Sequence, residues 1–295
     1  MTHSANDSRV VAVALGSLFP GDGGKPVGDT DRKQFKVSSD WQLLAARAQF
    51  AEPRGVLAGM PHGYMAEMLG RAAAAGEQLG LALTAVRDAE VWQDITPEPK
   101  DENRRTLAGR ALAEASGLWS ISTGHAAVNV VARVVRAHHD TTYLDKALRW
   151  NGPPKPFVES RDSNLSLNAE TVKALARAAR ESAELPLTAL VAPLRALVAD
   201  PDWGALTARR DVGYHRWRPQ SIEGGALTTN PWVDTGEHTM SLSVGITTGH
   251  VPPTLESLVQ ESRAGFDALS AAMREVFDAL PAAMISANIG IWKVE

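Results

Sequence analysis

The sequence contains no cysteine, so disulfide bonds and thiolate zinc sites are excluded. It also lacks any apolar run near the roughly 20 residues that a membrane-spanning helix needs. The start of the chain, MTHSANDSRVVAVALGSLFPGDGG, lacks the basic n-region of a secretory leader, and its apolar run VVAVAL is too short for one. These absences lead us to expect a cytoplasmic protein with no membrane partner.

Aromatic residues are also few, and the net charge is small. Aromatic side chains make up 6% of the 295 residues, whereas alanine and leucine are abundant, and this composition favours helices. The formal net charge is −4, so any attraction to nucleic acid must come from a local patch. With 44% hydrophobic residues, the chain has ample material for a core.

Apolar residues recur every three or four positions along much of the chain, which indicates amphipathic helices. We expect helices over about 38–51, 60–92, 101–139, 168–184, 186–200, 201–218 and 254–280. Asn168 and Asp202 are the expected N-caps of two of them. Gly70, Gly76 and Gly80 either weaken the second helix locally or let a partner helix approach closely.

The predicted fold is therefore an all-α, multi-helix bundle with long amphipathic helices and one long irregular loop over residues 219–253. Within that loop, MSLSVGI alternates with period two, as in a short strand or an ordered loop. Residues 1–39 are predicted to form a flexible N-terminal arm, and residues 40–295 a single helical domain. A proline-rich break near 150–165 is a candidate subdivision, but each half would expose helix faces that need the other.

One short stretch, ARRDVGYHRWRPQS (residues 208–221), is unusually rich in positively charged side chains. It contains one carboxylate, Asp211, among five side chains that can carry positive charge: Arg209, Arg210, His215, Arg216 and Arg218. An arginine offers a permanent, planar cation for a phosphate, and a histidine transfers protons near neutral pH. RNA cleavage by internal transesterification needs such a pair and no metal, because a base activates the ribose hydroxyl and a cation stabilises the phosphorane.

The segment RDVGYH within this run resembles the R-x4-6-H signature of the HEPN superfamily, a group of small helical domains. The resemblance implies a metal-independent endoribonuclease without a cofactor, typical of defence, toxin–antitoxin and RNA-processing systems, and a homodimer with a composite site. It implies catalytic roles for Arg210 and His215, with Asp211 as a polar orienting group. A toxin role would add an antitoxin or another protein partner.

The other residues of the run are assigned by their chemistry alone. Arg209, Arg216, Arg218 and Tyr214 are candidate RNA contacts. A structural alternative stands beside this assignment, because arginine and histidine near a helix C-terminus also interact favourably with the helix dipole and cap free carbonyls.

A second polar feature crosses the otherwise apolar helix expected over 101–139. Its members recur at spacings of three and four: Ser122, His125, Asn129, Arg133 and Arg136. Such a stripe either faces solvent or lines an internal polar site. If it is functional, His125 and Asn129 are candidate substrate-binding or supporting residues opposite the Arg210 and His215 pair.

No metal or nucleotide motif has the required spacing. Adjacent histidines in HHD (138–140) project about 100° apart on a helix and converge poorly, and GDGGKP lacks the spacing of a phosphate loop. Two alternatives to a ribonuclease stay open: a non-catalytic helical module that binds protein or nucleic acid through residues 209–218, and a metal enzyme built on His125, His138 and His215.

Overall fold

The structure is a computed structural model, and it describes residues 27–51, 62–95, 102–138, 165–215, 232–234, 240–242, 253–287 and 289. Over these ranges the chain forms seven helices and one pair of short strands. The helices are α2 (Asp29–Ala51), α3 (His62–Asp94), α4 (Glu102–His138), α6 (Ala169–Glu181), α7 (Leu185–Ala199), α8 (Pro201–His215) and α9 (Leu255–Ser286). The predicted all-α fold is confirmed.

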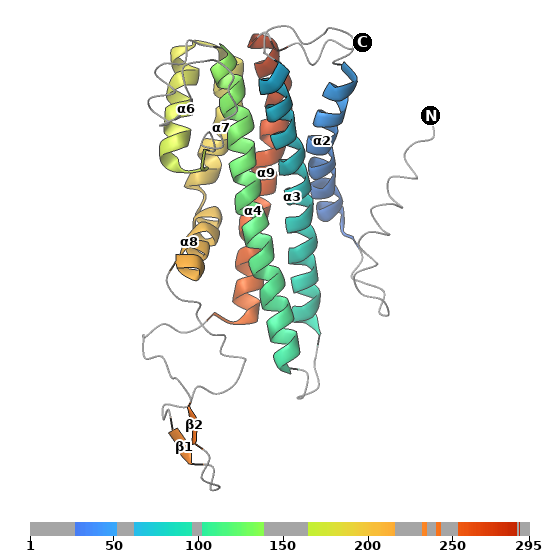
Figure 1. Cartoon of the computed structure of the whole chain (residues 1–295), viewed down its shortest axis with the longest axis vertical. Helices are drawn as coiled ribbons and strands as arrows, with labels where there is room; N and C mark the ends of the chain where they lie inside the picture. Colours follow the sequence, from blue (N-terminus) through green and yellow to red (C-terminus); the bar gives the residue numbers. More distant parts are fainter. Residues whose placement is uncertain are drawn as a thin grey trace, which may run out of the picture.

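Three long helices, α3, α4 and α9, run side by side through the middle of the molecule (Figure 1). The most extensive interface joins α3 to α4, and α2 packs on the outer side of α3. On the opposite flank, α6, α7 and α8 pack against α4 and α9. None of the helices in the described ranges is both long and apolar enough to cross a membrane.

The core is built from the apolar stripes of these helices. Its largest side chain, Trp41, is fully buried and donates a hydrogen bond from Nε1 to the carbonyl oxygen of Met273, 3.1 Å away. Phe266 is fully buried as well, and Phe277 packs beside Trp41 with 5.9 Å between ring centroids. The apolar spacing that predicted the C-terminal helix therefore matches the face of α9 that enters the core.

Helix α2 begins earlier than the sequence indicated. It begins at Asp29, so the predicted flexible arm over residues 1–39 is wrong for residues 29–39, while residues 1–26 lie outside the described part of the chain. The early turns are stabilised because Gln34, Val37 and Ser38 are buried, at spacings that continue to Trp41. Two acidic residues in the first turn also suit a helix N-terminus.

Two helix N-caps were predicted from the sequence, one for α6 and one for α8, and only the first agrees with the structure. Asn168 accepts a hydrogen bond from the Thr171 N–H at 2.9 Å, so its predicted cap is confirmed. The predicted cap at Asp202 is wrong, because Asp200 Oδ1 accepts from the N–H groups of Asp202 and Trp203 at 2.9 and 3.1 Å. Proline at 201 therefore occupies the first helical position, where its missing N–H costs nothing.

Within the segment 219–253, the structure describes two three-residue strands and residue 253. β1 (Trp232–Asp234) pairs antiparallel with β2 (Met240–Leu242), and β2 lies within the alternating MSLSVGI stretch. Of the two predicted possibilities, a short strand or an ordered loop, residues 240–242 form the strand. Residues 219–231, 235–239 and 243–252 of the predicted loop, and residues 150–164 of the predicted break, lie outside the described residues.

A close helix crossing explains two of the three glycines in α3. A Cβ on Gly76 would lie 2.6 Å from the carbonyl oxygen of Ser38, and one on Gly80 would lie 2.9 Å from the Ser38 hydroxyl. That hydroxyl donates to the carbonyl oxygen of Gly76 at 2.7 Å. Gly70 has nothing within 4 Å of its Cβ position. The predicted close approach is therefore confirmed at Gly76 and Gly80 and not at Gly70.

We expect Gly76→Ala to lower the free energy of unfolding by about 1–3 kcal/mol, because backbone atoms of α2 must move to admit the methyl group. Gly70→Ala is the matched control on the same helix, and we expect it to be stabilising by about 0.5–1 kcal/mol through helix propensity alone. Urea denaturation of both variants measures the difference. Equal effects at the two glycines would show that α2 and α3 do not cross at Gly76.

Candidate functional site

The predicted catalytic pair lies at the C-terminal end of α8. The helix is continuous from Pro201 to His215, so Gly213 does not interrupt it before the motif is complete. The described side chains of α8 extend to Arg209. For Arg210, Asp211, Tyr214 and His215 only the backbone is described, and Arg216 and Arg218 lie outside the described residues.

Arg209 attaches the end of α8 to α9. Its guanidinium donates to the Leu258 carbonyl oxygen at 3.2 Å and to the Ser262 hydroxyl at 2.7 Å. The same group lies 3.3 Å from a carboxylate oxygen of Glu261. Ser262 in turn donates to the Ala113 carbonyl oxygen at 3.0 Å, so α4, α8 and α9 meet at one hydrogen-bonded junction.

Burial and the partner's charge act in opposite directions on the pKa values of Arg209 and Glu261 at this junction. Burial lowers the pKa of Arg209, and the charge of Glu261 opposes that shift. Burial likewise raises the pKa of Glu261, while the charge of Arg209 counteracts it. Each member of the pair therefore compensates the other's desolvation, and removing one would leave the other poorly solvated and unpaired.

These contacts bear on the assignment of Arg209. Its side chain is 21% exposed, and it hydrogen-bonds or pairs with three residues of α9. Arg209 therefore has a structural role, because its guanidinium is engaged by α9, and its RNA contact stays a prediction. Sequence spacing gave no signal for this role, since the partners lie 49 and 53 residues further along the chain.

The polar stripe of α4 lines an internal site, one of its two predicted environments. Asn129 is 2% exposed, and its amide nitrogen donates to the carbonyl oxygens of His125 and Leu165 at 2.7 and 2.8 Å. Its amide oxygen accepts from the Leu165 N–H and from Arg133 at 3.1 and 3.3 Å. Both donors and both lone pairs of this side chain are used.

His125 holds the same segment one turn away. Its Nδ1 accepts from the Leu167 N–H at 2.9 Å. A Cβ on Gly124 would lie 2.8 Å from Leu167, so the segment before α6 packs tightly on α4. These contacts give His125 and Asn129 a structural role in fixing residues 165–167, and their substrate contacts stay a prediction.

We expect Asn129→Ala to lower the free energy of unfolding by about 1–3 kcal/mol, because it strips buried backbone groups at Leu165 of their partners. Ser122→Ala, at a half-buried position on the same helix, should change stability by less than about 0.5 kcal/mol. Chemical denaturation of the two variants provides the comparison. A change at Asn129 no larger than that at Ser122 would contradict the structural assignment.

Metal-ligating groups do not gather in the described part of the chain. Across those residues, no cluster of three or more histidine, aspartate or glutamate side chains is arranged to hold a metal ion. His138 lies 3.7 Å from a carboxylate oxygen of Glu184, and His125 binds the Leu167 N–H. His139, Asp140 and the side chain of His215 are outside the description, so the metal-enzyme alternative gains no support from the residues that are described.

In comparisons with known proteins, no family model, no curated protein sequence and no solved structure matches this chain. The resemblance to HEPN domains thus rests on the Arg210–His215 segment and on the all-helical fold around it.

Proposed function

We propose that the protein is a metal-independent endoribonuclease of HEPN type, with its site at the C-terminal end of α8. The observation that carries this proposal is that α8 continues unbroken through the whole RDVGYH segment. Arg209, the residue before the segment, ties that end of the helix to α9 at Glu261 and Ser262. A helix end fixed to the bundle suits a catalytic pair, because catalysis needs positions held within a fraction of an ångström.

In the proposed reaction, His215 accepts the proton of a ribose 2′-hydroxyl. The 2′-oxygen attacks the adjacent phosphorus, the bond to the 5′-oxygen breaks, and the leaving 5′-oxygen takes a proton from the protonated His215. The products are a 2′,3′-cyclic phosphate and a 5′-hydroxyl, and His215 returns to its neutral form. Arg210 stabilises the negative charge that builds up on the phosphorane. Asp211 orients this pair, and Arg216 and Arg218 bind flanking phosphates.

The geometry of α8 favours a site composed from two protomers. Positions five apart on a regular helix are about 140° apart around the axis and about 7.5 Å apart along it. Arg210 and His215 of one helix are therefore poorly placed to act on the same phosphorus. Two α8 ends brought together in a homodimer would set the arginine of one protomer opposite the histidine of the other.

Mixing two inactive variants tests the composite site. We expect Arg210→Ala and His215→Ala each to be inactive alone, and a mixture that has exchanged protomers to recover part of the wild-type activity. The heterodimer contains one intact pair, with histidine from one chain and arginine from the other. No recovery in a mixture that demonstrably contains heterodimers would place both groups of a site in one protomer.

A second candidate is a non-catalytic helical module that binds RNA or protein at the same end of α8. A helix end that Arg209 holds against α9 also suits a fixed contact surface, which needs no catalytic pair. Incubation of labelled RNA with the purified chain in EDTA separates the candidates. Cleavage supports the ribonuclease, retention of uncut RNA supports the binding module, and turnover only after metal is restored contradicts both.

A further inference from the structure

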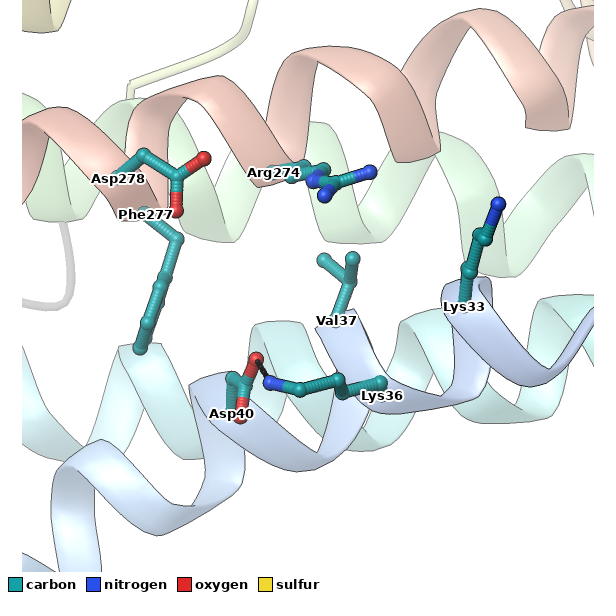
Figure 2. A pocket seen from close by; sticks show the side chains of 7 residues that line it. All are labelled: Lys33, Lys36, Val37, Asp40, Arg274, Phe277 and Asp278. Atoms are coloured by element: carbon teal, nitrogen blue, oxygen red, sulfur yellow. Dashed lines mark hydrogen bonds and ion pairs between the residues drawn. The ribbon is translucent and has the colours of Figure 1, made fainter. Parts of the chain in front are cut away.

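A small pocket lies between α2 and α9, on the flank of the bundle away from α8 (Figures 1 and 2). Its volume is about 130 Å³. Four of its lining residues come from α2 and three from α9: Lys33, Lys36, Val37, Asp40, Arg274, Phe277 and Asp278.

The charges around the pocket are only partly neutralised. Lys36 binds Asp40 at 2.6 Å within α2. Lys33 and Arg274 form no hydrogen bond or ion pair with any residue in the described part of the chain. Arg274 extends away from Asp278, four residues along the same helix, and toward the side of the pocket where Lys33 rises from α2 (Figure 2).

The opposite end of the pocket combines apolar side chains with the carboxylates of Asp40 and Asp278 (Figure 2). Val37 lies at its floor, and the Phe277 ring lines the end opposite Lys33 (Figure 2). Phe277 is half-buried and rests on Trp41, so the ring is supported from behind. The pocket therefore offers two unpaired cations at one end and an aromatic surface at the other.

We propose that this pocket binds one nucleotide unit, with its phosphate between Lys33 and Arg274 and its base against Phe277. The guanidinium can bind two phosphate oxygens at once, and the ammonium adds a compact positive charge. Aromatic rings stack on bases of any identity. Asp278, beside Phe277, can accept from a base amino group.

The size of the pocket indicates what carries the nucleotide. Pockets that enclose a whole small molecule measure roughly 300–1,000 Å³, and this one is less than half of that. It can take one group of a larger ligand, such as a single unit of a single-stranded RNA. The site is separate from the α8 end, so this inference goes beyond the proposed cleavage and does not depend on it.

The test measures fluorescence anisotropy of a labelled ten-nucleotide single-stranded 2′-O-methyl RNA, which the proposed transesterification cannot cleave, titrated with the full chain in EDTA. We expect the double variant Lys33→Ala/Arg274→Ala to bind about 5- to 30-fold more weakly than wild type, and the salt slope to fall by about 0.7 for the one lost phosphate contact. Arg195→Ala, which removes an exposed cation from α7, is the matched control and should bind as wild type does. Phe277→Leu should weaken binding while leaving the salt slope unchanged.

Competition with AMP and with inorganic phosphate identifies the source of the phosphate. Weaker binding of both RNA and AMP by the double variant supports a nucleotide site open to either, and an effect on RNA alone supports a site for the polymer. The inference is overturned if the double variant and Arg195→Ala bind RNA and AMP equally well, or if the loss is confined to inorganic phosphate. These titrations measure binding and not cleavage, so failure here is distinguishable from failure of the proposed ribonuclease.

Discussion

The His215→Ala variant should cleave RNA about 10²–10⁴-fold more slowly than the wild type, with little change in stability. This loss is the size expected when a general acid/base is removed. Single-turnover cleavage of a labelled RNA, with thermal unfolding measured in parallel, gives both quantities. A variant that unfolds far earlier, combined with a wild type that leaves RNA uncut, would show that the run is a capped helix end.

Arg210 provides a companion test with a conservative substitution. Arg210→Lys should also cleave slowly, because lysine keeps the charge and loses the planar fork that matches phosphate oxygens. Arg216→Ala and Arg218→Ala should weaken RNA binding and reduce its salt dependence, as expected for phosphate contacts. Full activity in Arg210→Lys would remove bidentate phosphate stabilisation from the mechanism.

The Arg209→Ala variant should lose about 2–4 kcal/mol of unfolding free energy. The substitution leaves Glu261 half-buried without its cation and removes donors from the Leu258 carbonyl and the Ser262 hydroxyl. We expect cleavage to slow as well, because the end of α8 is then no longer fixed to α9. Arg209 is a positioning residue in this account, so the salt dependence of RNA binding should stay as in wild type.

A second variant separates the charge effect from the loss of packing. In Arg209→Leu/Glu261→Leu no charge is left unpaired, so part of the lost stability should return. Denaturant unfolding of the single and double variants gives the coupling between the two sites. An additive result would contradict the pairing of Arg209 with Glu261, and a reduced salt slope in Arg209→Ala would identify this arginine as an RNA contact.

Most helices were predictable because their apolar spacing is a local property of the sequence. The ranges of α3, α4 and α9 agree with the predicted segments within a few residues at most boundaries. α9 runs six residues past its predicted end, through Pro281, because Leu280, Ala283 and Met284 stay buried against the core. Tertiary packing there outweighs the helix-breaking tendency of proline.

The start of α2 was missed for a related reason. Residues 29–39 are rich in charge, and that composition dominated over the sparse stripe of Gln34, Val37 and Ser38. Their burial depends on α3 and α9, which no local pattern shows. The polar network of Arg263 with Asp31 and Glu90, at 2.7 and 3.5 Å, joins the same three helices and was equally invisible in the sequence.

The candidate site was predictable only as a set of residue types. The sequence singled out the cationic run and the stripe of α4, and the structure gave Arg209, His125 and Asn129 structural partners far away in the chain. The pocket at Lys33 and Arg274 could not be found in the sequence, because those residues are 241 positions apart and meet only through the packing of α2 on α9.

The most direct test of the central claim is the chemistry of the RNA ends. Purified full-length chain is incubated with a defined RNA in EDTA, and the 3′ ends of the products are identified by mass spectrometry, with His215→Ala as the matched control. We predict 2′,3′-cyclic phosphate ends in the wild-type reaction and uncut RNA with the variant. Uncut RNA in both reactions, or 3′-hydroxyl ends formed equally by both, would contradict the proposed ribonuclease.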